Sequence, residues 1–153
     1  MDIHVECLPD ETLVKKLGFT KKQVSHHDGK PRVFANISCK TNQIALVDED
    51  PGSPPHKYEK QLELRKELHG VKYFVDSKRN NKVFVLKAKL EDWIISVCKK
   101  NNVDITKYGL PDKPNELHDI INYRLVPFAK LLDDLVQNEN VAIITLKKWL
   151  TNQ

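Results

Sequence analysis

The chain is poor in the residues that several classes of functional site require. Its five glycines form no GxGxxG or P-loop pattern, which argues against either kind of nucleotide site. Its three cysteines, Cys7, Cys39 and Cys98, show no CxxC or Cys/His spacing, so we expect no structural zinc site. We expect reduced thiols, with Cys39 and Cys98 packed as small apolar groups. Cys7 is either a bystander or a neighbour of an active site.

Long apolar segments and an N-terminal targeting pattern are also missing. No apolar run approaches the roughly 20 residues that a helix needs to cross a bilayer. The opening MDIHVEC has neither a basic region nor a small-residue cleavage site. We therefore expect a cytoplasmic protein without a membrane segment. The net charge of +4 is too weak by itself to indicate nucleic-acid binding.

What the chain does contain is enough apolar sequence for one compact unit. It has 153 residues, of which 40% are apolar and 30% charged, and this length is typical of one domain. We expect a single α/β domain over residues 1–153, with a mainly parallel sheet flanked by helices. The α/β core should span about residues 2–100, and a helical C-terminal portion should span about residues 114–150.

Hydrophobic spacing and turn residues predict the individual elements. The run at 43–47 (QIALV) is almost continuously apolar, as in a strand that is buried on both faces. Pro9 fits the first turn of a helix that Gly18 ends. The other expected strands are 3–6, a hairpin of 22–28 and 31–38 about Asp28-Gly29, and the pair 71–77 and 82–87. The other expected helices are 56–70, 88–100, 116–121, 124–136 and 141–150.

Two of the expected strands end in acidic residues, and each acid is followed by a turn. Glu6 ends the first strand and Asp48 ends the buried one, and groups at the carboxyl ends of parallel strands meet in one crevice. Asp50 can point to the same side, since residues i and i+2 do so along an extended chain. Three carboxylates so close would repel one another unless they are protonated or bridged by a cation. Their hard oxygens suit Mg²⁺ or Mn²⁺.

A simpler interpretation of the same residues stays open. Asp, Pro and Gly dominate surface turns, so the sequence DEDPG at 48–52 is also what an ordinary turn looks like. The second acid-ended strand, with a helix one loop away, favours the metal site over the turn.

The two motifs VEC-LPDETLVKKLG (5–18) and IALVDEDPG (44–52) resemble the Toprim domain. This catalytic fold is shared by topoisomerases, bacterial primases and overcoming-lysogenization-defect nucleases, and its pattern is a Glu after the first strand and a later hydrophobic strand running into Asp-x-Asp. The resemblance covers roughly residues 2–100 and is closest to small stand-alone nucleases of the overcoming-lysogenization-defect type. Cys7 departs from the family, in which a glycine commonly follows the Glu.

The resemblance also implies further site residues. Such nucleases carry an additional acid near the first Glu and another in a later Leu-Glu helix, and Asp10 and Glu91 match these positions. Trp93, two residues beyond Glu91, should face the core. The phosphate of a substrate would need cations, for which the candidates are Lys87, Lys89 and Lys147. Lys147 is also explained as part of a solvated helix face.

The resemblance implies a Mg²⁺-dependent (or Mn²⁺-dependent) nuclease that hydrolyses phosphodiester bonds in DNA or RNA, as part of a defence or mobile-element system. Hydrolysis by water is favoured because 153 residues leave no room for a topoisomerase's separate tyrosine domain. The alternative is a non-catalytic α/β module that binds a protein or nucleotide partner. The apolar faces of the C-terminal helices either pack on the sheet or form a homodimer or hetero-complex surface.

Overall fold

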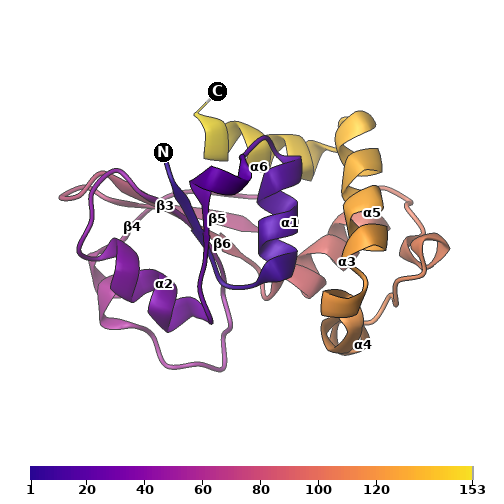
Figure 1. Ribbon diagram of the computed structural model, residues 1–153, viewed down its shortest axis with the longest axis horizontal. Coiled ribbons are helices and arrows are strands. Elements are labelled where there is room, and N and C mark those ends of the chain that lie inside the picture. The colour runs from indigo at the N-terminus through magenta and orange to yellow at the C-terminus, as the bar shows by residue number, and fades with distance from the viewer. Residues whose placement is uncertain (153) are drawn as a thin grey trace.

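The protein is built around one six-stranded sheet with the strand order β2-β1-β3-β6-β5-β4, seen in the computed structural model of Figure 1. The structure describes residues 1–152. The strands are β1 (Ile3–Val5), β2 (Val24–His26), β3 (Ile44–Asp48), β4 (Glu63–Leu68), β5 (Val71–Asp76) and β6 (Asn81–Leu86). The first four strands in the spatial order are parallel, while β5 pairs antiparallel with both of its neighbours. The expected α/β fold with a mainly parallel sheet is confirmed.

Strand β3 holds the central position that its sequence predicts. It lies between β1 and β6, and both neighbours run parallel to it. Ile44 and Leu46 belong to the core on one face of the sheet, whereas Ala45 and Val47 belong to the core on the other. Such two-sided burial explains why the strand is apolar at successive positions instead of alternating.

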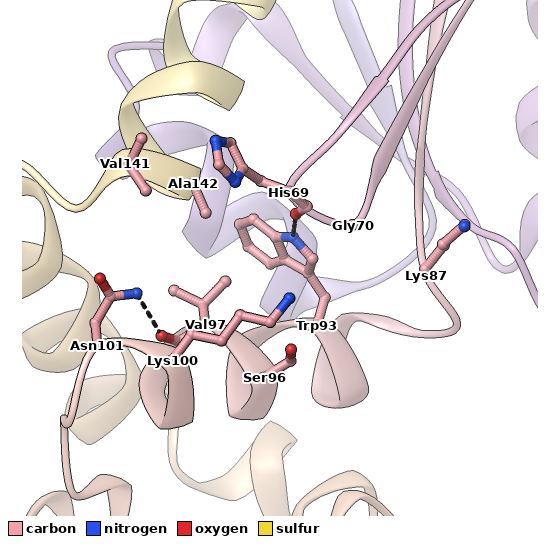
Figure 2. A pocket seen from close by; sticks show the side chains of 10 residues that line it. All are labelled: His69, Gly70, Lys87, Trp93, Ser96, Val97, Lys100, Asn101, Val141 and Ala142. Carbon is pink, nitrogen blue, oxygen red and sulfur yellow. Dashed lines mark hydrogen bonds between the residues drawn. The ribbon is translucent and has the colours of Figure 1, made fainter.

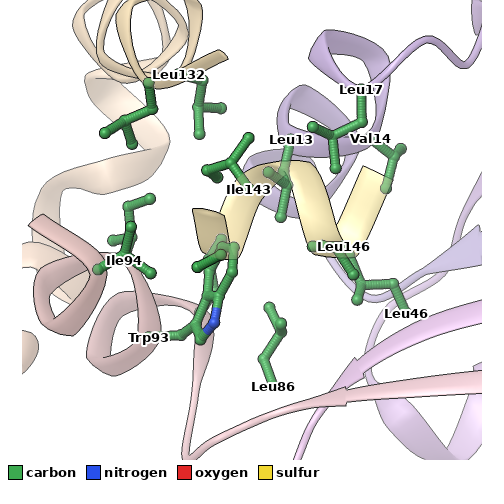
Figure 3. Close-up of a cluster of buried hydrophobic side chains, with 14 of the residues drawn as sticks. Leu13, Val14, Leu17, Leu46, Leu86, Trp93, Ile94, Leu132, Ile143 and Leu146 are labelled. Carbon is green, nitrogen blue, oxygen red and sulfur yellow. The ribbon is translucent and has the colours of Figure 1, made fainter. Parts of the chain in front are cut away.

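Helices cover both faces of the sheet, but unequally. They are α1 (Leu8–Lys16), α2 (Lys30–Ile37), α3 (Leu90–Lys100), α4 (Pro114–Ile120), α5 (Leu125–Gln137) and α6 (Val141–Thr151). Side chains of α1, α3, α4, α5 and α6 share the larger core (Figure 3), in which Trp93 is only 2% exposed, as expected. Helix α2 covers the opposite face together with Tyr58. None of the helices within residues 1–152 is long and apolar enough to cross a membrane.

The hairpin expected about Asp28-Gly29 is wrong. Only Val24–His26 forms a strand there, and Gly29, with φ of 95°, is the N-cap of helix α2. Pro31 lies in the first turn of α2, where a proline loses no hydrogen bond because the first N–H groups of a helix have no intrahelical partner. The chain therefore makes a β-loop-α unit, and α2 begins at the carboxyl edge of the sheet.

The helix expected over residues 56–70 is also wrong. The segment forms a short 3₁₀ helix, η2 (Lys57–Gln61), and then the edge strand β4, whose six residues are all exposed. His69 and Gly70 both have positive φ and join β4 to β5 in a two-residue hairpin. Hydrogen bonding to β5 therefore prevails over the helical propensity of the segment.

Cys98 is buried as expected, but Cys39 is exposed, which corrects its predicted packing.

Candidate metal centre

The first two acids of the candidate site lie side by side at the carboxyl edge of the sheet. Glu6 follows β1 directly and Asp48 ends β3, and these two strands are parallel neighbours. The Asp48 backbone N–H donates a hydrogen bond of 2.6 Å to Oε2 of Glu6. The convergence expected from two acid-ended strands therefore occurs.

Asp10 joins this pair from the first turn of α1. Its side chain is only 1% exposed. The Cys7 thiol donates to Oδ2 of Asp10 at 3.2 Å, whereas Oδ1 has no hydrogen-bond partner. Burying a carboxylate oxygen without a partner is unfavourable. Among the buried side-chain oxygens and nitrogens of residues 1–152, this one alone lacks a partner.

Glu91 is the fourth acid of the cluster and lies on the first turn of α3. The backbone N–H of Leu90 donates to Oδ1 of Asp48 at 2.9 Å, so the start of α3 is held against Asp48. Glu91 itself is 6% exposed, and its Oε1 lies 3.1 Å from Nδ1 of His118 on α4. The negative charges of Asp10 and Glu91 are therefore both close to the Glu6–Asp48 pair.

The pKa values show how strongly these acids influence one another. Burial, and then the charges of Glu6 and Glu91, raise the pKa of Asp10 to about 7. Burial, and then the charges of Asp10, Glu6 and Glu91, raise the pKa of Asp48 to about 9. Burial also raises the pKa of Glu6, although the Asp48 N–H and the Lys30 charge oppose it. Such shifts are expected where several carboxylates share a desolvated site.

Asp50 lies near the cluster but is turned differently from the expectation. Its φ is 48°, so the chain is not extended there, and Oδ2 accepts a hydrogen bond of 2.6 Å from the Ser53 hydroxyl. Asp tolerates this left-handed conformation better than most residues. The charge of Asp50 still raises the pKa of Glu6, so the two carboxylates interact.

Lys30 is a member of the site that the sequence analysis missed. Its ammonium donates to the carbonyl oxygens of Asp48 at 3.1 Å and Glu49 at 2.8 Å. It also lies 3.5 Å from Oε1 of Glu59 on η2. The lysine thus fixes the turn that carries the acids and brings a positive charge beside Glu6. The sequence Gly29-Lys30-Pro31 could have indicated the start of a helix at Lys30, since proline is favoured in the first turn of a helix.

The three lysines expected to bind phosphate lie in different surroundings. Lys87 follows β6 at the acid-bearing edge but forms an ion pair with Glu67. Lys89 is the N-cap residue of α3, next to Leu90 and Glu91. Lys147 is on α6. The C-terminal end of this helix lies at the start of β6, away from the acids, where Lys82 donates to Oδ1 of Asn152 at 2.7 Å. The structure therefore brings Lys87 and Lys89, but not Lys147, to the edge that carries the acids.

The donor set fits a hard divalent cation, although the side chains are not closed around one. Within residues 1–152, no group of three or more His, Cys, Asp or Glu side chains is arranged to hold a metal ion as it stands. Binding therefore requires side-chain rotation. The unpartnered Oδ1 of Asp10 and the mutual repulsion of the acids both favour a cation among them.

A separate cavity of about 440 Å³ lies on the other side of α3. Figure 2 shows it between the indole of Trp93, the start of α6 and the side chains of Lys87 and Lys100. The Trp93 indole N–H donates to the His69 carbonyl at 2.9 Å. None of the acids lines this cavity, so it is distinct from the candidate metal centre.

Comparison of the chain with protein-family models, with curated proteins and with solved structures found no match. The geometry and charges of the site are therefore the basis for assigning a function.

Proposed function

We propose that the protein is a Toprim-like nuclease that uses Mg²⁺ or Mn²⁺ to hydrolyse phosphodiester bonds in DNA or RNA. One observation carries the proposal. A hydrogen bond joins Glu6 to Asp48 at the carboxyl edge of the sheet, the charges of Asp10 and Glu91 act on Asp48, and one buried oxygen of Asp10 has no partner. A solvated surface turn would need neither the burial nor the convergence.

The residues of the chain have separable roles in this proposal. Glu6, Asp10 and Asp48 would hold the cation, with Asp50 and Glu91 at its margin, and the chemistry it would supply there is Lewis-acid activation of the phosphate and of a water. The Asp48 N–H orients Glu6, and the Leu90 N–H orients Asp48. Lys30 holds the Asp48–Glu49 turn in place. Lys89, beside this edge, is the candidate contact for a substrate phosphate.

The proposal includes a cytoplasmic location and a role in a defence or mobile-element system. The second candidate function is a non-catalytic module that binds a protein or nucleotide partner. It is favoured by one observation, namely that Glu6 and Asp48 each accept a backbone N–H, as purely structural acids do. Loss of activity on neutralising Asp48 distinguishes the two.

The experiment compares Asp48→Asn with the wild type on single- and double-stranded DNA and RNA, with Mg²⁺ or Mn²⁺. Asparagine keeps an oxygen that can accept from the Leu90 N–H, so the fold should persist. The loss of one charged metal ligand should reduce cleavage by several orders of magnitude. The matched control is Asp112→Asn, which neutralises an exposed acid outside the site and should cleave like the wild type. Equal cleavage by Asp48→Asn, or no cleavage by the wild type, would contradict the proposal.

A further inference from the structure

Two of the most exposed large apolar side chains lie at the start of α5. Tyr123 is 86% exposed and Val126 is 83% exposed. Single exposed apolar residues are ordinary on a protein surface. These two, however, are three residues apart, and Val126 lines two adjoining hollows of about 500 and 490 Å³.

The two hollows form one shallow groove, since both are also lined by Lys130. Val126 and Lys130 are four residues apart on α5 and therefore share one face of the helix. The opposite wall of the first hollow comes from α1, through Thr12, Lys15 and Lys16. The second hollow is bordered by Lys107 and Tyr108.

The groove carries positive charge that the protein leaves unmatched. Lys107 and Lys130, which line the groove, and Arg124, which immediately precedes α5, have no ion-pair partner in the part of the chain that the structure describes. Both acids of the groove have a partner within the protein, but only Asp133 has a cationic one. Asp133 pairs with Lys16 at 2.9 Å, and Asp134 accepts from the Tyr108 hydroxyl at 2.5 Å.

Elements that border the groove also border the candidate metal centre. Helix α1 carries Asp10 in its first turn and the groove residue Thr12 two positions later, about 200° around the helix, so the groove lies on the other side of α1 from Asp10. On the other side, α4 holds His118 against Glu91 and continues through η4 (Ile121–Tyr123) to Tyr123. Figure 1 shows α1 and α5 beside each other, with α4 at the start of α5.

We propose that this groove, together with Tyr123 and Arg124 just before α5, binds a single-stranded segment of nucleic acid. The phosphates contact Lys107, Arg124 and Lys130, and a base stacks on the Tyr123 ring. This combination of cations and an exposed aromatic ring is how proteins hold single strands without reading their sequence. A protein partner would call for a larger apolar area than Tyr123 and Val126 provide. The inference rests on the proposed function, because it names the strand form of the substrate.

The test measures binding of labelled oligo-dT and oligo-rU of about 12 nucleotides, and of a DNA duplex, by fluorescence anisotropy in EDTA. Chelation stops metal-dependent cleavage, so binding is observed alone. Tyr123→Ala should weaken single-strand binding about tenfold, while Tyr123→Phe, which keeps the ring, should bind like the wild type. Lys130→Gln should reduce the slope of log affinity against log salt by about 0.7, as expected for one lost phosphate contact. The dT and rU arms show whether DNA or RNA is preferred.

Lys21→Gln is the matched charge control, because Lys21 is exposed at the opposite edge of the sheet, and it should leave the affinity unchanged. Equal affinity of Tyr123→Ala and the wild type, or binding of the duplex alone, would overturn the inference. The absence of any binding would overturn it too and would favour a protein partner on this face. The inference and the proposed function can fail separately. If the wild type binds single strands but does not cleave them, only the proposed nuclease activity is contradicted. If the wild type cleaves nucleic acid but Tyr123→Ala does not weaken binding, only the proposed role of the groove is contradicted.

Discussion

Asp10 and Asp76 have the same side chain and the same 1% exposure, yet their surroundings are opposite. Asp76, at the end of β5, accepts hydrogen bonds from the Tyr58 hydroxyl at 2.9 Å and from the Arg79 guanidinium at 3.1 Å. It also accepts from the backbone N–H groups of Lys78 and Arg79. Burial by itself would raise the pKa of Asp76, but these hydrogen bonds outweigh it and lower the pKa.

For Asp10, by contrast, the Cys7 thiol donates to Oδ2, and Oδ1 has no hydrogen-bond partner among residues 1–152. Its pKa is raised to about 7 by burial and by the neighbouring acids. A buried aspartate that is fully hydrogen-bonded serves the fold, whereas one that is crowded by other acids destabilises the fold unless a cation or a proton neutralises it. The difference between the two residues is therefore the difference between a structural acid and a candidate ligand.

The largest effect should come from neutralising the two aspartates in turn. Asp76→Asn replaces one acceptor oxygen by a donor that faces Tyr58 and Arg79, and should lower the free energy of unfolding by about 3 kcal/mol. Asp10→Asn removes a crowded charge and should raise the free energy of unfolding by about 1 kcal/mol near pH 8. Urea denaturation in EDTA measures both. An Asp10→Asn variant as unstable as Asp76→Asn would place Asp10 among the structural acids.

A smaller effect should appear as pH dependence. A carboxyl group whose pKa is raised on folding stabilises the protein at low pH, and this contribution is lost as pH rises through the folded pKa. For Asp10 and Asp48 that loss falls between about pH 4 and the folded values of about 7 and 9. For Asp76, with its lowered pKa, stability is instead lost in acid, below about pH 4.

Metal-free wild type should therefore lose stability on the order of several kcal/mol from pH 5 to pH 8.5 through the acid cluster. The lowered pKa of His27 gives the opposite slope as its ring titrates. The informative measurement is thus the urea midpoint of the wild type against that of Asp10→Asn, which keeps His27. Parallel pH profiles for the two proteins would show that Asp10 is not under electrostatic stress.

Much of the fold could be predicted from local pattern, and the errors have identifiable causes. The unbroken apolar run of β3 identified the centre of the sheet, because only two-sided burial permits it. Strand β4 was missed because its exposed residues carry no burial pattern, and its partner strand determines its conformation. The two-residue hairpin at His69-Gly70 was the available signal, and glycine is typical of such a turn.

The part of the candidate site that could be predicted consists of acidic residues at the ends of parallel strands. Glu6 and Asp48 could be placed together because parallel strands end at one edge. Asp10 and Glu91 followed from the resemblance to the Toprim domain, but their burial could not, because it depends on how α1 and α3 pack. Lys30 was missed because the misassigned hairpin moved it away from the site. The left-handed turn at Asp50 depends on tertiary hydrogen bonds, such as that from its N–H to the Ala88 carbonyl at 3.0 Å.

The most direct test of the metal centre is the stabilisation of the folded protein by Mg²⁺ or Mn²⁺, measured by urea denaturation at constant ionic strength. At about ten times its dissociation constant, a cation that binds only the folded state raises the free energy of unfolding by about 1.4 kcal/mol. We expect this saturable increase in the wild type and in Asp112→Asn, and we expect Asp48→Asn to lose it. The absence of metal stabilisation in the wild type, or an equal increase in Asp48→Asn, would contradict the assignment of these carboxylates as ligands.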